Sequence, residues 1–484
     1  MPGPCGGGLI RLQNLCDWHL HRACVCEQPP LEDGVRKLTR CSMVPVQGWA
    51  VAVLAGALQT LAAHTVANAG GFSVREQSAY YLGTAFAGSA AGGEISSVFW
   101  NSAATASLPG CNTSSSYTGV FADSDVTARA GSLVTGLPPI AAGLQPTAAD
   151  IGRDGLVPAS YMTCQLSDRL YAGLGLNAPF GLLTKPDNTA WAGSPIAITS
   201  RLFSVNINPT LAYKLTPELT IGIGAQIEYF KLRLTHGAFN SLLGPLSGSR
   251  SFDADDWGVG ATAGVLWQPN PGTSVGLGYR SAVGIDASGS FVRSAGQIPA
   301  VSTSATGSLT LPDELTLSAR QVVGPRLAIM GTVEWQNWSR LQNVTAVSSG
   351  CGGTGVCEVL NLNYRDGWFY SLGAEYAYSP TLLLRAGVGY ETSPIQDSTR
   401  DILIPDSNRV FLSAGASYKY SDEITVDFGY SHLFFQDAPF CIASAAQNGG
   451  TTHCNATTSP AAVLLRGSSD NSADLLAIGL RYKF

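Results

Sequence analysis

The sequence predicts an all-β fold, a 14-stranded antiparallel transmembrane β-barrel with an N-terminal hatch, or plug, inside the lumen. Three observations predict it. Only 13% of the 484 residues are charged and 55 are glycine, which is unusual for a protein whose whole surface faces water. Apolar residues alternate with small or polar ones through most of the chain. The segments formed in this way are joined by connections that are alternately short and long.

The first 69 residues are expected to lie outside the functional fold. Residues 48–63 form the only long apolar stretch, which follows basic residues and precedes small ones. This stretch is shorter than the roughly 20 apolar residues that a membrane anchor needs. We therefore predict that residues 35–69 are a signal peptide, cleaved before Gly70. Residues 1–34 contain cysteines and histidines that a metal site could use, but their place upstream of a signal favours a mis-set start or a non-structural extension.

Residues 70–109 are predicted to form the hatch. The segment is rich in Gly, Ala and Ser and has no clear strand period. A barrel of fourteen strands encloses more space than its own side chains fill, so a compact plug is a natural occupant of the lumen. A flexible periplasmic tail is the alternative.

Residues 110–484 are predicted to form the barrel. In residues 219–229, for example, the alternation gives one greasy face and one wet face. Outer-membrane barrels join their strands by short periplasmic turns and longer extracellular loops. Six short turns and seven long loops make fourteen strands. The turns are expected at 165–169, 215–218, 269–272, 323–325, 379–380 and 421–423, and the loops at 123–155, 181–200, 236–252, 288–306, 341–363, 392–406 and 436–468.

The C-terminal strand ends with an aromatic residue. Ile478, Leu480, Tyr482 and Phe484 share one face, a pattern that resembles the signal read by barrel-assembly machinery in the outer membrane. Tyrosines and tryptophans near strand ends are expected to form interfacial girdles, with ordinary buried aromatics as the alternative. These residues are Trp257, Trp267, Trp335, Trp368, Tyr418 and Tyr420.

Motifs spread over the whole mature chain resemble those of one family. In order they are Gly71-Phe72-Ser73-Val74, Tyr81 to Gly88, Phe99 to Ala103, Ala178-Pro179-Phe180-Gly181, Ile207-Asn208-Pro209, Ala212-Tyr213-Lys214, Tyr279-Arg280-Ser281, Leu311-Pro312, Trp335 to Ser339, and Ile404 to Gly415. The sequence in this respect resembles the FadL/TodX family of outer-membrane long-chain fatty-acid transporters.

The resemblance implies a monomeric fourteen-stranded barrel whose hatch blocks the lumen. It also implies ligand capture at the extracellular loops and transfer to an internal apolar pocket. A plug of residues 70–109 is smaller than an energised, gated receptor needs, so we expect plug-controlled, passive transfer. The family's hatch carries Asn-Pro-Ala, whereas this chain has Asn101, Ser102 and Ala103, so the fixed φ of proline is lost at this gating position. The loop at 236–250 is shorter than in familiar members.

A fatty-acid receptor needs a dry groove for the chain and a cation for the carboxylate. Strand parity places four arginines on the lumen face, with Glu228 and Glu334 as possible partners: Arg280, Arg365, Arg385 and Arg409. We favour Arg365 and Arg409 for ligand contact. The alternative is that lumenal arginines pair with acids or with the plug. The resemblance also places Phe72 beside the pocket, with core packing as the alternative.

Two strand irregularities are predicted. Pro209 removes one ladder hydrogen bond, which indicates a bulge or a local opening. The resembling family has a kink in its third strand that opens a lateral exit, and here Gly173, Gly175 and Pro179 make a kink in that strand plausible.

Six cysteines follow the predicted signal peptide, and an even number in an exported protein suggests disulfides. The predicted topology pairs Cys351 with Cys357 and Cys441 with Cys454, each pair within one extracellular loop. Cys111 and Cys164 are expected to meet at the periplasmic ends of the first two strands. We predict no metal site and no cofactor.

Other function classes fit less well. The net charge of -6 and scattered basic residues do not indicate a nucleic-acid partner. Residues 272–276 match the five-residue serine-hydrolase motif, but they run from a turn into a strand rather than into a helix, so we do not predict an enzyme. A general porin would have no hatch, and an adhesin role remains open. The expected partners are a fatty acid or another hydrophobic molecule, including an aromatic hydrocarbon, the outer-membrane lipid and the barrel-assembly machinery.

Overall fold

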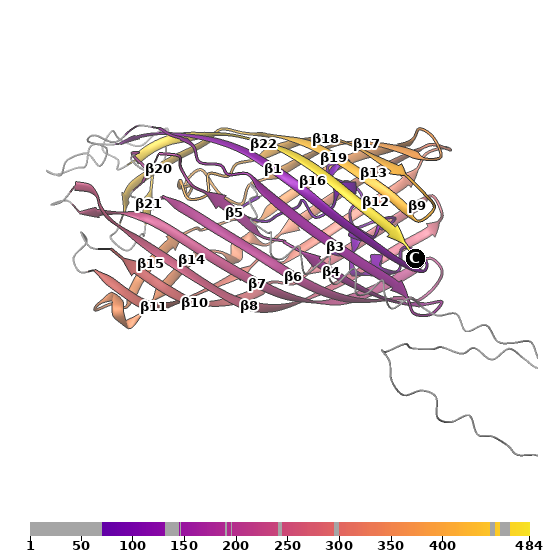
Figure 1. The fold of residues 1–484 in the computed structure, drawn as a ribbon, viewed down its shortest axis with the longest axis horizontal. Helices are drawn as coiled ribbons and strands as arrows, with labels where there is room; N and C mark the ends of the chain where they lie inside the picture. Colours follow the sequence, from indigo (N-terminus) through magenta and orange to yellow (C-terminus); the bar gives the residue numbers. More distant parts are fainter. Residues whose placement is uncertain are drawn as a thin grey trace, which may run out of the picture. The chain divides into compact units, whose positions relative to one another are not determined.

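The computed structural model describes residues 70–130, 145, 147–188, 191–194, 196–240, 244–294, 300–445, 451–454 and 465–484. The predicted extension at 1–34 and signal peptide at 35–69 lie outside the described residues. The described chain forms one closed antiparallel barrel of fourteen wall strands, which confirms the predicted fold (Figure 1). The first wall strand, β1 (Cys111–Ala130), pairs along its length with the last, β22 (Leu465–Lys483), and this pairing closes the wall.

The other wall strands follow one another in chain order, and three of them are interrupted and so carry two labels. They are β3 (Gly155–Gln165), β4 with β5 (Leu170–Asn177, Gly181–Thr184), β6 (Thr199–Lys214), β7 (Leu219–Asn240), β8 (Gly244–Asn270), β9 with β10 (Thr273–Arg280, Val283–Arg293), β11 with β12 (Val301–Leu311, Glu314–Val322), β13 (Leu327–Gln336), β16 (Gly367–Ala377), β17 (Leu382–Thr392), β18 (Arg409–Lys419) and β19 (Ile424–Phe435).

Several short elements lie at the end of the barrel opposite the C-terminus. They are β2 (Thr147–Asp150), β14 (Asn343–Val347), β15 (Val356–Asn361), β20 (Ala438–Ala445), β21 (Thr451–His453), and the 3-10 turns η3 (Trp338–Arg340) and η4 (Ser349–Cys351). Among the described residues, no helix is both long and apolar enough to cross a membrane.

Two of the predicted extracellular loops are instead continuations of strands. The prediction of loops at 236–252 and 288–306 is wrong, because β7 extends to Asn240 and β8 starts at Gly244. In the same way, Arg293 of β10 pairs with Val301 of β11. These hairpins keep their ladder hydrogen bonds beyond the part of the barrel that faces the membrane. Both faces of a strand meet water there, so the sequence is polar although the segment is a strand.

The greasy face of the alternation lies on the outside of the barrel. Outward residues such as Ile223 and Val259 are 65% and 72% exposed, whereas their neighbours along the strand face the packed lumen. Five of the six predicted girdle aromatics are exposed as well, for example Trp257 at 57% and Tyr420 at 73%, whereas Trp335 is half-buried. A surface this apolar is stable only in contact with lipid.

Of the two irregularities predicted at Pro209, a bulge or a local opening, the structure has the local opening. Asn208 and Pro209 of β6 have no ladder partner in β7. Ile207 pairs with Ile227 and Thr210 with Gly224, so the register is the same on both sides of this gap. Pro209 still faces Leu174 of β4. The proline therefore removes ladder bonds without shifting the strands.

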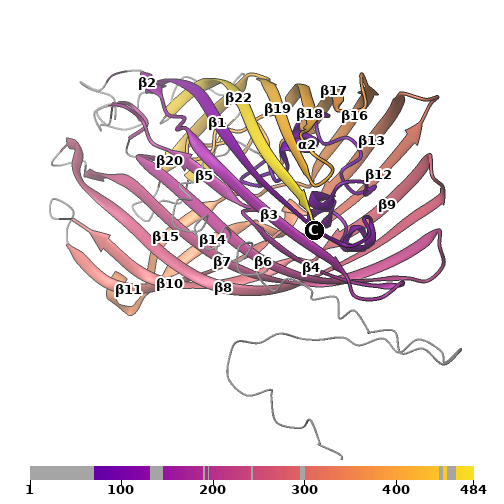
Figure 2. The ribbon, with the colours of Figure 1, turned by 45° about the vertical axis from the view of Figure 1, so that its right-hand side comes forward.

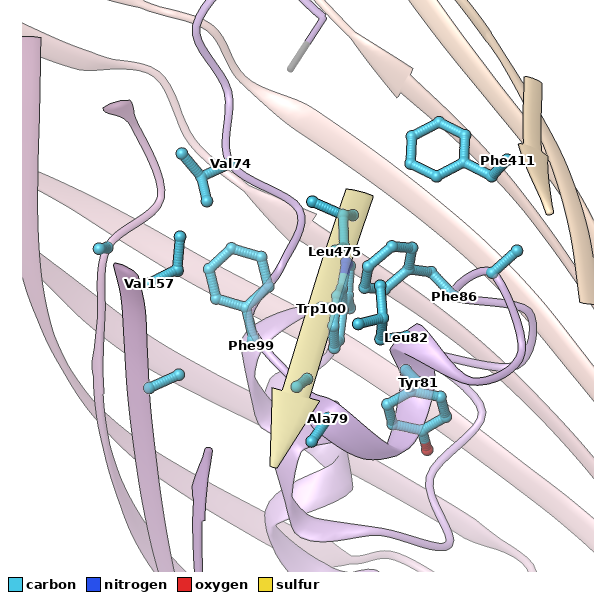
Figure 3. Packing of buried hydrophobic residues seen from close by; sticks show 14 of the residues in the cluster. Val74, Ala79, Tyr81, Leu82, Phe86, Phe99, Trp100, Val157, Phe411 and Leu475 are labelled. Carbon is cyan, nitrogen blue, oxygen red and sulfur yellow. The ribbon is translucent and has the colours of Figure 1, made fainter. Parts of the chain in front are cut away.

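The hatch is a compact segment inside the lumen (Figure 2). It begins at Gly70 and contains α2 (Ala79–Leu82), η1 (Ile95–Phe99) and η2 (Ser102–Ala106), and nearly all of its side chains are buried. Figure 3 shows its aromatic residues, among them Tyr81, Phe86 and Trp100, packed with one another and with wall residues such as Leu475. The prediction of a plug agrees with this arrangement, which differs from a free tail.

Glycines on the lumen face let the hatch backbone lie directly against the wall. A Cβ atom on Gly222 of β7 would lie 2.3 Å from the Ala103 nitrogen, and one on Gly387 of β17 would lie 2.1 Å from the Thr84 carbonyl oxygen. These contacts come from strands far apart around the barrel. The many glycines on the lumen face of the strands therefore also make room for the backbone of the hatch.

Candidate functional site

The hatch is built from very short helical turns, each capped by a side chain. Ser78 accepts a hydrogen bond from the Tyr81 amide at the start of α2, and Glu94 accepts one from the Ser96 amide at the start of η1. Such turns have little intrinsic stability. Their conformation is thus set by caps and by the surrounding wall.

The kink at Asn101, Ser102 and Ala103 is set without proline. The Asn101 side chain accepts a hydrogen bond from the Ala103 amide at 3.0 Å, which caps η2. Its amide nitrogen donates to the carbonyl oxygens of Ala90 and Val265 at 2.8 and 3.0 Å. The Ser102 hydroxyl lies 2.6 Å from that of Thr262 in β8. One asparagine therefore ties the turn both to the hatch and to the wall.

We predict that Ser102→Pro is tolerated, whereas Asn101→Ala is destabilising. Ser102 is the first residue of η2, where proline's missing amide is not needed, and Asn101 already has extended backbone angles. Loss of the cap should cost about 1 kcal/mol, and the two wall bonds add to this. Unfolding of the detergent-solubilised barrel in urea would measure both variants. A Ser102→Pro variant that unfolds as early as Asn101→Ala would contradict this account of the kink.

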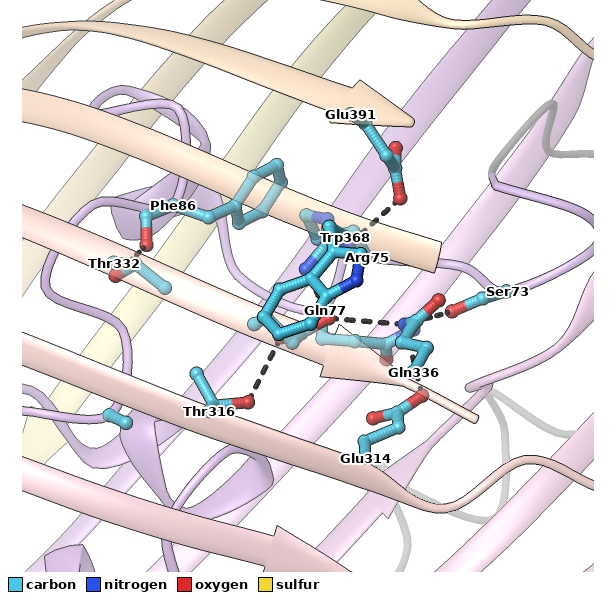
Figure 4. A network of polar contacts seen from close by, with 12 residues as sticks. Ser73, Arg75, Gln77, Phe86, Glu314, Thr316, Thr332, Gln336, Trp368 and Glu391 are labelled. Carbon is cyan, nitrogen blue, oxygen red and sulfur yellow. Dashed lines mark hydrogen bonds and ion pairs between the residues drawn. The ribbon is translucent and has the colours of Figure 1, made fainter. Parts of the chain in front are cut away.

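A chain of buried ion pairs joins the hatch to the wall at its N-terminal end. Arg75 of the hatch contacts Glu334 of β13 at 2.6 Å and Glu391 of β17 at 2.9 Å. Glu391 also accepts from Arg409 of β18 at 2.8 Å, and Arg409 reaches Asp406 at 3.1 Å. Figure 4 shows Arg75 reaching Glu391, with Gln336 nearby between Ser73 and Glu314.

The end of this ion-pair chain returns to the hatch backbone. Asp406 accepts a hydrogen bond from the Gly71 amide at 3.1 Å. Burial raises the pKa of the Asp406 carboxyl above its usual range, and Arg409 opposes that shift. Burial likewise raises the pKa of Glu76 in the hatch, again opposed by Arg409. The first residues of the hatch are thus held at both Gly71 and Arg75.

Three of the four predicted arginines face the lumen, as expected. Arg280 donates to the Phe99 carbonyl oxygen at 3.2 Å and lies 3.8 Å from Glu314. Arg385 lies 3.6 Å from Asp427 and 4.1 Å from the ring centre of Tyr80 in the hatch. These two arginines and Arg409 thus contact acidic residues of the wall and groups of the hatch. This pairing is the alternative to ligand contact that the sequence analysis considered.

The lumenal placement of Arg365 is wrong. Arg365 is exposed and precedes β16, which starts at Gly367, so strand parity does not apply to it. Its side chain donates to the Ser393 carbonyl oxygen at 3.4 Å. Of the two predicted acidic partners, Glu334 pairs with Arg75, and Glu228 is fully buried but forms no ion pair with the described arginines.

An apolar cavity lies beside the N-terminus of the hatch. Phe72 lines it, as predicted, and packs against Trp338 and Phe180 with ring centres 4.7 and 6.0 Å away. Leucines from several strands and loops supply most of the remaining lining: Leu182, Leu202, Leu232, Leu234, Leu309, Leu341, Leu360, Leu362 and Leu403.

The third wall strand is interrupted at residues 178–180, between β4 and β5. Gly173 and Gly175 lie in continuous ladder with β6, so the interruption is not at these glycines but at Pro179. The backbone groups freed there bond to the hatch: the Val74 amide donates to the Pro179 oxygen at 2.7 Å, and the Gly181 amide donates to the Phe72 oxygen at 2.9 Å.

This interruption leaves part of the second wall strand unpaired on one side. Within the described residues, β3 pairs with β4 only from Ser160 to Gln165, and residues 155–159 of β3 have no partner from β5. On the lumen side, hatch residues including Val74 and Phe99 pack in one cluster with Val157 of β3. The wall is thus least continuous where the hatch covers it.

The three predicted cysteine pairs are joined in the structure. Cys111 lies opposite Cys164 in the β1–β3 ladder, with a Cα–Cα distance of 4.1 Å. Cys351 joins Cys357 within the β14–β15 hairpin, and Cys441 joins Cys454 beside β20 and β21. Each pair therefore fixes the end of a strand or loop rather than a residue of the cavity.

Sequence reasoning missed Arg75 and Gln77. The Gln77 side chain donates to the Ala178 oxygen at 2.7 Å and accepts from the Ala178 amide, so it occupies the strand break. A signal was present for Arg75: the hatch contains only three charged residues, Arg75, Glu76 and Glu94, in a segment rich in Gly, Ala and Ser. A charge in such a buried segment requires an ion-pair partner.

The chain is similar to outer-membrane transport proteins over nearly all of the described fold. Residues 60–484 match the family model described as outer membrane protein transport protein (OMPP1/FadL/TodX). The chain is 29% identical to outer membrane protein P1 of Haemophilus influenzae, over 86% of this chain and 96% of that one. It is 27% identical to a long-chain fatty acid transport protein of Salmonella typhi, over 61% and 74% of the two chains.

Solved structures share the fold. A Pseudomonas aeruginosa FadL homologue superposes with a TM-score of 0.74 at 20% identity, covering 86% of this chain and all of the other. The Pseudomonas putida toluene transporter TodX gives a TM-score of 0.61 at 17% identity, with 86% and 100% covered. From the family match and the barrel, the chain belongs to the OMPP1/FadL/TodX family of outer membrane transport proteins and resides in the outer membrane.

Proposed function

We propose that this protein takes up long-chain fatty acids or similar hydrophobic molecules across the outer membrane. The ligand enters the apolar cavity beside Phe72 and moves passively past the hatch. The observation that carries the proposal is this cavity, which is lined mainly by leucines and other apolar side chains and lies against Phe72 of the hatch.

The cavity explains why the ligand should be apolar. Each buried methylene contributes about 0.8 kcal/mol, so an alkyl chain gains affinity along its whole length. Arg280, Arg385 and Arg409 are engaged with wall acids and hatch groups. The tail therefore supplies most of the affinity, and these arginines serve mainly to hold the hatch.

A lateral route follows from the interrupted wall. The cavity and the strand break share Phe72 and its neighbours in the hatch. A ligand that displaces the Phe72–Val74 segment would free the groups of Pro179 and Gly181 and reach the unpaired part of β3. Such a path leads into the membrane and spares an apolar molecule a passage through water.

The test is binding of radiolabelled oleate and of toluene to the purified, refolded mature barrel. Saturable oleate binding supports fatty-acid uptake, and toluene binding alone supports hydrocarbon uptake instead. The relatives include proteins named for each activity. Binding of neither ligand would overturn the proposal. Arg365→Ala should leave oleate binding unchanged, because Arg365 is exposed and lies outside the cavity.

Leu202→Asp is predicted to weaken oleate binding at least about tenfold, because a carboxylate in an apolar cavity is costly to desolvate and repels the ligand's own carboxylate. Leu202 lies opposite Leu232 in the β6–β7 ladder, and both line the cavity. Leu202→Met, which nearly conserves volume, is the matched control and should bind within about twofold of the wild type. Equal binding by the aspartate variant would place the ligand elsewhere.

Transport is favoured over catalysis by the position of the serine in the hydrolase-like motif. The Ser274 hydroxyl bonds to the Ala91 carbonyl oxygen of the hatch, and the motif runs from a turn into β9.

We also propose that the protein works as a monomer and that its exposed C-terminal Phe484 is recognised by the barrel-assembly machinery.

A further inference from the structure

The β14–β15 hairpin forms part of the outer wall of the apolar cavity. It connects β13 to β16 at the end of the barrel away from the C-terminus (Figure 1). Residues 341–363, called the flap below, carry the lining residues Leu341, Val344, Leu360 and Leu362. The barrel wall contributes others, such as Leu234 of β7. The cavity therefore lies between the flap and the wall.

Few backbone bonds hold the flap to the barrel. In the part of the chain that the structure describes, β14 pairs with β11 in two rows, and β15 pairs only with β14. The wall strands β13 and β16, by comparison, pair in ten rows. The edge formed by β15 is therefore held by side chains, among them Asn361, which donates to the Thr451 carbonyl oxygen at 2.7 Å.

Glu358 of β15 makes the charged contact at this edge. Its carboxylate lies 3.0 Å from Nε of Arg250 in β8 and 3.6 Å from Nε2 of His236 in β7. All three side chains are buried. In the ladder, Arg250 lies opposite His236 on one side and opposite Arg293 on the other. A carboxylate of the flap thus faces a row of basic side chains of the wall.

This charged contact lies directly beside the cavity. Neighbouring side chains on one face of a strand are two residues apart. Leu360 follows Glu358 by two residues in β15, and Leu234 precedes His236 by two in β7. Both leucines line the cavity. Separating Glu358 from the wall would therefore open the cavity at this edge.

The base of the flap is anchored by buried aromatic rings. Trp338 and Tyr364 lie there with ring centres 5.9 Å apart, and Trp338 also packs against Phe72 of the hatch. Near the tip, the disulfide between Cys351 and Cys357 joins the two sides of the hairpin. With a fixed base and two strands held together, the flap can move as one body about its base.

We propose that the flap is the entry gate of the cavity and that the contact of Glu358 with Arg250 and His236 is its latch. The flap keeps its base and its pairing with β11, while the edge that carries Glu358 leaves the wall. A ligand enters or leaves while the latch is open, and the latch then closes over it. This inference rests on the proposed function, because it takes the cavity as the ligand site.

The first test measures opening of the flap without a ligand. Leu234→Cys places one thiol in the cavity, where the native side chain is 5% exposed, and the six cysteines of the barrel are joined in disulfides. In this background, Glu358→Gln should raise the rate of modification by a water-soluble maleimide about tenfold, because a hydrogen bond to a charged group contributes enough to shift the opening equilibrium by that factor. Asp187→Asn, which removes an exposed carboxylate from a loop at the same end, is the matched control and should leave the rate unchanged.

Arg250→Gln in the same background separates loss of the latch from general loosening. It should raise the modification rate as Glu358→Gln does, and the double variant should be no faster than the faster single one, because both remove the same interaction. An unchanged rate in Glu358→Gln overturns the proposal, and so does a double variant whose effect is the product of the two single effects. Heat-modifiable gel mobility checks that each barrel is closed.

The second test measures exchange of oleate, or of toluene if only toluene binds, in barrels that keep Leu234. In Glu358→Gln the association and dissociation rate constants should rise together, about tenfold each, with Kd within about twofold, because a gate controls passage in both directions. Faster dissociation alone is the behaviour of a lost binding contact and would contradict the gate. If the barrel binds neither ligand, the proposed function fails, and the thiol test still decides whether the flap opens.

Discussion

Replacing Arg75 with alanine is expected to release the hatch from the wall and to open the barrel to small hydrophilic solutes. Arg75 is 5% exposed, and its guanidinium group contacts Glu334 and Glu391 and lies 3.8 Å from the ring centre of Phe369. Removing it leaves two buried carboxylates facing an empty space. Breaking a buried ion pair from one side costs about 3–5 kcal/mol, which is large compared with the stability of such a short, weakly helical segment.

Two measurements separate hatch release from general unfolding. Conductance of the reconstituted barrel should rise, and amide hydrogen exchange should speed up in residues 70–106 while the wall strands stay protected. Arg153→Ala is the matched control, because it removes an exposed ion pair with Asp187 at the loop end, and exposed pairs contribute about 0–1 kcal/mol. A closed, fully protected hatch in Arg75→Ala would show that the ion-pair chain does not hold it.

The fold could be predicted from the sequence because its signal is repeated in every strand. Alternation over residues 219–229 reappears as outward Ile223 and Ile227 and inward Gly222 and Gln226. The lengths of the hairpins were not predictable in the same way. Above the membrane both strand faces meet water, so the polar sequences of β7 near Asn240 and of a true loop look alike.

The site could be predicted only in part. Phe72 and three lumenal arginines were identified. Arg75 was not, and its partner Glu334 lies 259 residues further along the chain. Alternation of lumenal and outward residues holds only within a strand. The prediction for Arg365 failed because β16 starts two residues later, at Gly367. The cavity's leucines come partly from lumen-facing strand positions, such as Leu202 and Leu232, and partly from loops, such as Leu341. Only the closed barrel and the inserted hatch bring them to one place.

Gly278→Ala is expected to dislodge the middle of the hatch. Gly278 lies in β9 on the lumen face, where an added Cβ would stand 1.7 Å from the Trp100 carbonyl oxygen. Neither group can move easily, because β9 pairs on both sides with β8 and β12, and Trp100 packs on Tyr81, Phe86 and Phe99. Overpacking of this kind costs about 1–3 kcal/mol, and the Gly276→Ala/Gly278→Ala pair should cost more, since Gly276 faces the Ala90 oxygen in the same way.

Gly284→Ala provides the matched control for this substitution. Gly284 lies in β10, the continuation of the same wall strand, but a Cβ there would meet nothing within 4 Å. Gly284 is exposed on the outer face, so the added methyl group there changes the strand propensity in the same way without contacting the hatch. Limited proteolysis should cut within residues 70–106 of the Gly278→Ala barrel and leave the Gly284→Ala hatch intact. If residues 70–106 resist proteolysis equally in both variants, the hatch can shift to accommodate the added methyl group. The lumenal glycines would then be needed for insertion of the hatch during folding and not for its position in the folded barrel.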